Sequence, residues 1–203
     1  MPGHASCRTV MLLGIFFLLL HACMPSKKTE IDGTLSQSKK TEIDDTLRQS
    51  NQYLSAGDYQ KAIDTLRTAH TKYPEDKPLL RSYQKAVEEM KGSANRAFDR
   101  EKFVSAGRSY RLLLRNYRHF GDFAQQLSFD KKYLNARITY CSEYLFKRGV
   151  EEYRSGDIKH AISSWEGLLS FDPGNAETAK AYQSATTQLK NLQQKKIVTV
   201  SSS

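Results

Sequence analysis

Four arginines are the residues best placed, by type and spacing, to bind a partner. Arg108, Arg111, Arg115 and Arg118 are three, four and three positions apart, which puts them on one face of a helix. Guanidinium groups form paired hydrogen bonds with phosphate or carboxylate. Segment 91–118 holds eight basic and two acidic residues, or +6 of the chain's +9. The pattern predicts a binding surface, which we call the basic stripe. A solvated helix face is the competing interpretation.

Catalytic and metal-binding motifs are missing from the sequence. It contains no G-x-S-x-G, H-E-x-x-H, paired C-x-x-C or phosphate-binding glycine loop. His70, His119 and His160 are scattered, and we expect them at the surface or its boundary. Cys141 is expected to be a small buried hydrophobe, and Trp165 to belong to the core. The sequence therefore predicts no enzyme, no cofactor and no metal site.

Two similar segments indicate the elements that must position these residues. GDYQKAI at 57–63 and GDIKHAI at 156–162 are 99 residues apart, and Pro74 and Pro173 follow them at equal distances. A glycine allows the chain to turn after one helix, and the following Asp can cap the next. A small Ala lets two helices approach, and a proline stops the second helix. Each segment therefore predicts a helical hairpin, with apolar residues at Leu66, Ala69, Trp165 and Leu168 on the packing faces.

These spacings resemble the tetratricopeptide repeat, a helix–turn–helix unit. A weaker copy has Glu101-Lys102 in place of Gly-Asp and an apolar series at Phe103, Ala106, Tyr110 and Leu113. The resemblance covers about residues 43–192 and implies an all-α array of about three units. The turns are 44 and 55 residues apart, more than one repeat, so extra helix is expected. Segments 78–91 and 175–192 are the candidates.

The same resemblance implies a groove lined by the first helices of the units. Some members of the family hold a peptide's terminal carboxylate with a Lys and an Asn one turn apart. Lys91 and Asn95 fall on those positions in the middle unit, and Asn51 on the Asn position of the first unit, where Leu47 replaces the Lys. These three residues are candidate groove residues, and ordinary helix-surface residues are the alternative.

The N-terminus predicts export. Val10 to Leu20 is an apolar run of 11 residues, too short for the ~20 residues that span a bilayer and typical of a signal peptide. The following Leu-His-Ala-Cys resembles the lipobox of bacterial lipoproteins, with His21 in place of the usual small residue. The resemblance implies cleavage after residue 22 and acylation of Cys23, including a palmitate-type chain. A plain secretory signal is the alternative.

A tandem duplication follows the cysteine. Residues 27–38 and 39–50 differ at only two positions. A shift of 12 residues turns a helix by about 120° beyond full turns, so both copies cannot dock on the core in the same way. We expect the second copy to dock and residues 23–42 to form a tether. A motif presented twice is the alternative. Residues 193–203 are expected to form a flexible tail.

Together these features predict a lipid-anchored scaffold or accessory protein on the periplasmic side of a bacterial envelope. It would bind a partner protein through the repeat groove, in assembly of an envelope complex. Met24 does not match the Asp that retains some lipoproteins in the inner membrane, which favours the outer membrane. The competing function is direct binding of envelope polyanions through the basic stripe. Export excludes nucleic acid as a partner, and no small-molecule substrate is expected.

Overall fold

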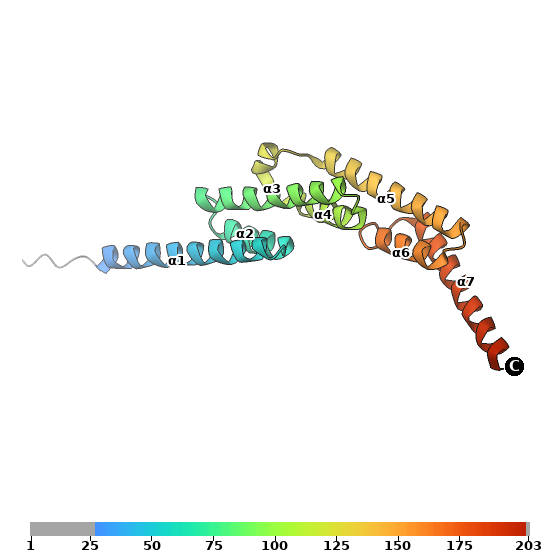
Figure 1. The fold of residues 1–203 in the computed structure, drawn as a ribbon. Coiled ribbons are helices and arrows are strands. Elements are labelled where there is room, and N and C mark those ends of the chain that lie inside the picture. The colour runs from blue at the N-terminus through green and yellow to red at the C-terminus, as the bar shows by residue number, and fades with distance from the viewer. Residues whose placement is uncertain (1–26, 202–203) are drawn as a thin grey trace, which may run out of the picture. The chain divides into compact units, whose positions relative to one another are not determined.

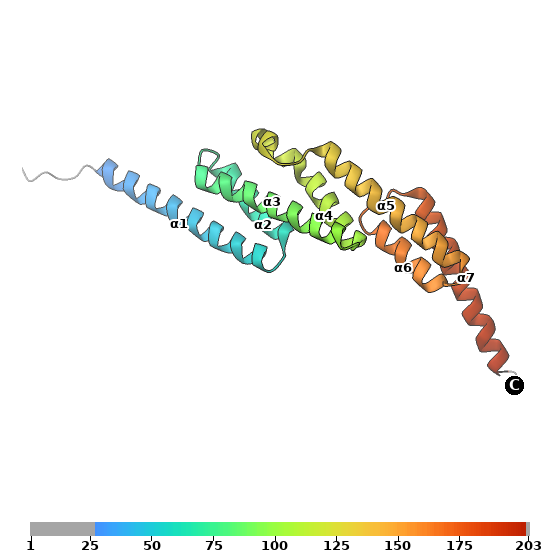
Figure 2. The ribbon, with the colours of Figure 1, turned by 45° about the horizontal axis from the view of Figure 1, so that its top comes forward.

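The computed structural model describes the backbone of residues 27–201 and the side chains of residues 36–195 apart from residue 122. The described residues form seven α-helices and two short 3₁₀ helices, and they contain no strand. The predicted all-α class is confirmed. The chain divides into two compact units, with the boundary between Glu42 and Ile43. Figures 1 and 2 show the helices in chain order.

The first helix, α1 (Lys27–Ser55), contains both copies of the duplication. In the second copy Ile43 is buried and Leu47 packs against the core. Ile31 and Leu35 of the first copy lie outside the side chains described, and residues 36–42 are exposed. The second copy therefore docks as the 12-residue geometry predicts, while the tether stays a prediction.

Residues 43–201 form three successive hairpins and a final helix. The second half of α1 lies beside α2 (Figures 1 and 2). Helix α3 pairs with α4, α5 pairs with α6, and α7 packs on α6. Short 3₁₀ helices η1 and η2 connect the second hairpin to the third (Figures 1 and 2). The bounds are α2 (Tyr59–Lys72), α3 (Lys77–Asp99), α4 (Phe103–Asn116), η1 (Tyr117–His119), η2 (Gly121–Gln126), α5 (Lys131–Arg154), α6 (Ile158–Leu169) and α7 (Ala176–Ser201).

The wide spacing of the turns has a different origin from the one expected. Segment 78–91 is not a separate extra helix, because it is continuous with the first helix of the second hairpin in α3. The first helices α3 and α5 are long, with 23 and 24 residues. The 3₁₀ insertion η1–η2 supplies the remaining length. The expected helix at 175–192 is present as α7, which continues to Ser201, and the flexible tail stays a prediction.

All three hairpins turn with the same backbone geometry. Gly57, Glu101 and Gly156 have positive φ angles of 78°, 57° and 87°. At each turn the amide of the next residue donates to a carbonyl five positions earlier, at 2.8 to 2.9 Å. This hydrogen bond belongs to the Schellman arrangement, which satisfies carbonyls left free at a helix end. The middle turn, which lacks glycine, therefore keeps the fold of its neighbours with a glutamate in the left-handed region.

The sequence predicted an aspartate cap at the start of α2 and of α6, and only the cap of α6 is present. The Asp157 carboxylate accepts a hydrogen bond from the His160 amide at 3.3 Å, as expected of a cap. The expected cap at Asp58 is wrong, because that carboxylate instead pairs with Lys61 Nζ at 2.9 Å. This exposed pair raises the pKa of Lys61 through the Asp58 hydrogen bond. Helix α2 ends two residues before Pro74, as the proline predicts.

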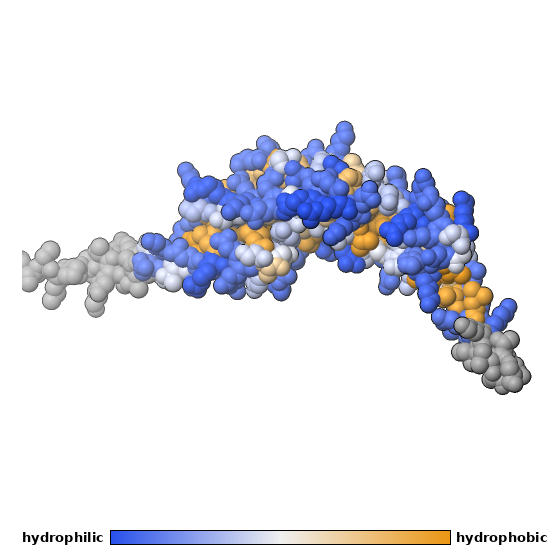
Figure 3. Space-filling view, viewed as in Figure 1, coloured by the Kyte–Doolittle hydropathy of each residue, from blue (hydrophilic) through white to orange (hydrophobic). Residues whose placement is uncertain are grey.

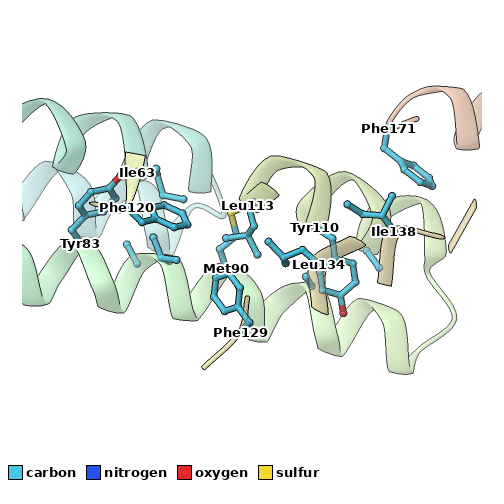
Figure 4. Packing of buried hydrophobic residues seen from close by; sticks show 14 of the residues in the cluster. Ile63, Tyr83, Met90, Tyr110, Leu113, Phe120, Phe129, Leu134, Ile138 and Phe171 are labelled. Atoms are coloured by element: carbon cyan, nitrogen blue, oxygen red, sulfur yellow. The ribbon is translucent and has the colours of Figure 1, made fainter. Parts of the chain in front are cut away.

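The core consists of two clusters of buried side chains. The larger runs from the first hairpin to Leu168 of α6 and the following Phe171 (Figure 4). Within it Tyr83 lies beside Phe120, and Met90 beside Leu113. The smaller joins α5, α6 and α7 around Trp165, which is 2% exposed. Half-buried Phe146 packs against both clusters. The apolar positions predicted for both similar segments are buried: Ala62, Leu66, Ala69, Ala161, Trp165 and Leu168.

Candidate functional site: an aromatic face on the third hairpin

The basic stripe is divided between two elements. Arg108, Arg111 and Arg115 lie on α4, whereas Arg118 belongs to η1, because α4 ends at Asn116. Arg108, Arg115 and Arg118 are exposed, and Arg111 is half-buried. One continuous helix therefore does not carry all four arginines, although three of them reach solvent.

Two of these arginines contact the segment that follows α6. Arg111 Nε donates to the Phe171 carbonyl at 2.8 Å, and its Nη2 lies 2.6 Å from Asp172 Oδ1. Arg108 Nε donates to Ser170 Oγ at 2.8 Å. These bonds fasten the second hairpin to the third. Asp172 is an acidic partner more than 50 residues away in sequence, and it neutralises part of the basic stripe.

The predicted groove residues of the middle unit lie together between α3 and α5. Asn95 Oδ1 accepts hydrogen bonds from the hydroxyls of Tyr110 and Tyr133, at 2.7 and 2.8 Å. Lys91 Nζ donates to Ser128 Oγ at 3.1 Å and lies 5.9 Å from the centre of the Tyr133 ring. Both side chains thus hold α5 and its preceding loop against α3.

Asn51, the third groove candidate, is exposed on α1. Its backbone carbonyl accepts a hydrogen bond from the Ser55 hydroxyl at 2.9 Å. The structure therefore brings Lys91 and Asn95 together around Tyr133 and places Asn51 on a different helix. The role of the three residues in binding a carboxylate stays a prediction.

A cluster that the sequence analysis did not name is the candidate functional site. We define the α5 aromatic face as Arg137, Tyr140 and Tyr144 of α5 with Phe98 of α3 and Phe103 of α4. Tyr140 is 50% exposed and Tyr144 39%, the two most exposed aromatic side chains among the described residues. Figure 3 shows a surface that is largely hydrophilic, with several hydrophobic patches.

Ring contacts hold the two tyrosines in place. The Tyr140 centroid lies 5.0 Å from that of Phe98 and 5.7 Å from that of Phe103. The Tyr144 ring is 4.3 Å from Phe103, which is itself 5% exposed. The two Tyr140 distances are in the range of favourable aromatic pairs, and the Tyr144 ring lies slightly closer. The exposed rings are therefore anchored on a buried one and have little freedom left to lose on binding.

Arg137 adds a positive charge to the same face. Its Cζ lies 4.3 Å from the Phe98 centroid and 5.3 Å from that of Tyr133, both within cation–π range. No ion pair to Arg137 is found among the described side chains, those of residues 36–121 and 123–195. The guanidinium is thus stacked on aromatic rings and lacks a carboxylate partner from this part of the chain.

The spacing of these residues was the available signal. Tyr133, Arg137, Tyr140 and Tyr144 are four, three and four positions apart, a spacing that lines one helix face. A stripe of this kind can be read equally as a buried packing face. Whether this stripe is buried or exposed depends on where α3 and α4 end, and these ends leave Tyr140 and Tyr144 half uncovered.

The remaining reactive groups have structural surroundings. Cys141 is fully buried, as expected, and this burial raises the pKa of its thiol from 9.0 to about 11. In the part of the chain that the structure describes, no group of His, Cys, Asp or Glu is arranged to hold a metal ion. No helix there is long and apolar enough to cross a bilayer.

No protein-family model, curated protein or solved structure matches this chain. Cys23 and the apolar run before it lie outside the described residues, so acylation stays a prediction.

Proposed function

We propose that this chain is a lipid-anchored scaffold or accessory protein of a bacterial envelope, facing the periplasm, which holds a partner protein on a tetratricopeptide-like array. The α5 aromatic face is the observation that supports the binding role. Tyrosine and arginine are enriched among the residues that contribute most to protein interfaces. Rings already fixed by their neighbours lose less entropy on association.

The binding role is tested by site-specific crosslinking in the native envelope. A photoreactive benzoylphenylalanine replaces Tyr140 in one strain and Asn135, an exposed residue elsewhere on α5, in a matched control. We expect irradiation to give a discrete adduct at position 140 that is absent at position 135, and mass spectrometry identifies the protein. Equal adducts at both positions, or none at position 140, would contradict the proposal.

The anchor is tested separately at Cys23. Wild-type chain is expected to incorporate a clickable palmitate analogue and to sediment with membranes. A Cys23→Ala variant should lose the label and remain unprocessed or soluble. Labelling that persists in the variant would show that Cys23 is not the acylated residue. The result leaves the crosslinking test unaffected, since that depends on α5 alone.

The basic stripe supports the rival function, binding of an envelope polyanion, because Arg108, Arg115 and Arg118 are exposed. Arg115→Glu with Arg118→Glu changes the charge of this surface by four units and leaves the Arg111–Asp172 pair intact. If these variants abolish binding to purified envelope polymer while Tyr140→Ala does not, the rival is correct. The scaffold proposal predicts the opposite pattern for capture of the partner protein.

A further inference from the structure

The α5 aromatic face is uncovered because neighbouring first helices end at different levels. Helix α3 ends at Asp99, and its Phe98 contacts Tyr140 and Arg137. Helix α5 continues to Arg154, so Tyr144, one turn beyond Tyr140, has no ring contact from α3 and rests on Phe103 instead. The step between the two helices leaves a ledge of ordered rings.

Basic side chains outnumber acidic ones in the segments that form this ledge. Lys102, the residue before Phe103, and Lys147, which follows Tyr144 by three positions, are both exposed. Segments 96–103 and 137–147 together carry five basic and three acidic residues. Neither lysine forms an ion pair with another described residue. The α5 aromatic face is thus bordered by a net positive charge of two, which includes exposed Glu143 as well as Lys102 and Lys147.

We infer that the occupant of the α5 aromatic face is an acidic segment of a partner protein, with an aromatic or leucine side chain flanked by carboxylates. The apolar side chain would lie on Tyr140 and Tyr144, and a carboxylate would receive hydrogen bonds from Arg137. A carboxylate matches the planar guanidinium fork, and a charge pair at an interface steers association and selects the partner. This inference rests on the proposed function and names the chemistry of the partner.

A random-sequence peptide library tests the inference without knowledge of the partner. The full chain, held in detergent micelles, is the bait, and enriched peptides are sequenced. We expect enrichment of peptides that combine Asp or Glu with Trp, Phe or Leu. Tyr140→Ala with Tyr144→Ala should lower recovery by about tenfold, as for residues central to an interface. Asn135→Ala with Thr139→Ala, two exposed positions on α5, should leave recovery unchanged.

Charge variants test the acidic character separately from the aromatic one. Arg137→Gln and Lys147→Glu should remove the excess of Asp and Glu among the enriched peptides. A higher salt concentration should weaken the binding of enriched peptides to the wild-type chain. Circular dichroism of each variant confirms that it is folded, which is expected since Tyr140 and Tyr144 are half-exposed.

Three results would overturn the inference. Absence of enriched peptides contradicts it directly. Enriched peptides that lack acidic residues but require Tyr140 and Tyr144 refute the acidic partner and leave the proposed protein-binding function in place. Binding to phosphatidylglycerol vesicles that is lost with the two tyrosines, without peptide enrichment, would assign the face to a membrane surface instead.

Discussion

Gly149 of α5 lies so close to Trp165 of α6 that a Cβ built on the glycine would be 2.4 Å from the indole nitrogen. That nitrogen donates to the Phe146 carbonyl at 3.2 Å. The third hairpin thus closes around a tryptophan whose ring occupies the space of a missing side chain. This contact joins α5, which carries the aromatic face, to α6.

Gly149→Ala should therefore destabilise the chain. The indole is buried and hydrogen-bonded and cannot move away cheaply, so we expect a loss of about 1–3 kcal/mol, as for overpacked cores. Urea unfolding followed by circular dichroism measures the change. Gly174→Ala is the matched control, because a Cβ there meets nothing within 4 Å. Equal effects at both positions would contradict a specific clash between the added methyl group and the indole.

Glu101 offers a stabilising change at the middle turn. Its φ of 57° lies in the left-handed region, which costs an ordinary residue roughly 1 kcal/mol. Glu101→Gly should raise the free energy of unfolding by up to about 1 kcal/mol, less the entropy that glycine adds to the unfolded chain. Gly57→Ala and Gly156→Ala should lower it, since both glycines have positive φ. A loss of stability in Glu101→Gly would mean that the glutamate side chain stabilises the turn.

Local patterns predicted the hairpins because each depends on neighbours in sequence. The Gly-Asp turns, the small Ala161 and the buried Trp165 all lie within one or two helical turns of one another. Periodicity and turn chemistry are sufficient at that range. The cap at Asp58 was mispredicted because two groups compete for its exposed carboxylate: a backbone amide of the helix and the ammonium group of Lys61, three residues away.

The candidate site could not be predicted in the same way. Exposure of Tyr140 depends on where α3 ends relative to α5, and the η1–η2 insertion and the lengths of both helices set that relation. The Asp172 partner of Arg111 is likewise a contact between hairpins. Sequence spacing identifies a helix face, but only the packing of successive hairpins determines whether that face is covered.

Arg111 and Asp172 should contribute measurably to the junction of the second and third hairpins. Both side chains are about 70% buried, at 30% and 27% exposure, and Arg111 also binds a backbone carbonyl. We expect Arg111→Ala to cost about 1–3 kcal/mol, as for hydrogen bonds to charged groups. A double-mutant cycle with Asp172→Asn should give a coupling of about 0.5 kcal/mol or more.

Arg115→Ala is the control for that cycle, because Arg115 is exposed on the same helix. Its effect on unfolding should stay within about 0.5 kcal/mol. Additive effects of Arg111→Ala and Asp172→Asn would show that the pair, despite its 2.6 Å separation, adds nothing beyond its separate parts.

Stability should fall at alkaline pH through Cys141. Burial raises the pKa of its thiol from 9.0 to about 11, so the folded chain keeps a proton that the unfolded chain releases. The unfolded state binds fewer protons between these values, and the free energy of unfolding therefore decreases as pH rises from 9 to 11. Cys141→Ala should reduce this slope. Burial also raises the pKa of Tyr83 to about 12. The free energy of unfolding of the Cys141→Ala variant should therefore still decrease above pH 10.

Alkylation gives an independent reading of the same thiol. At pH 9 iodoacetamide should label the Cys141 peptide at least about tenfold more slowly in the native chain than in urea, because a buried thiol is both shielded and protonated. Peptide mass spectrometry distinguishes Cys141 from the other cysteines of the full chain. Equal labelling rates in the native and unfolded chain would contradict the burial of Cys141, and with it the predicted alkaline slope.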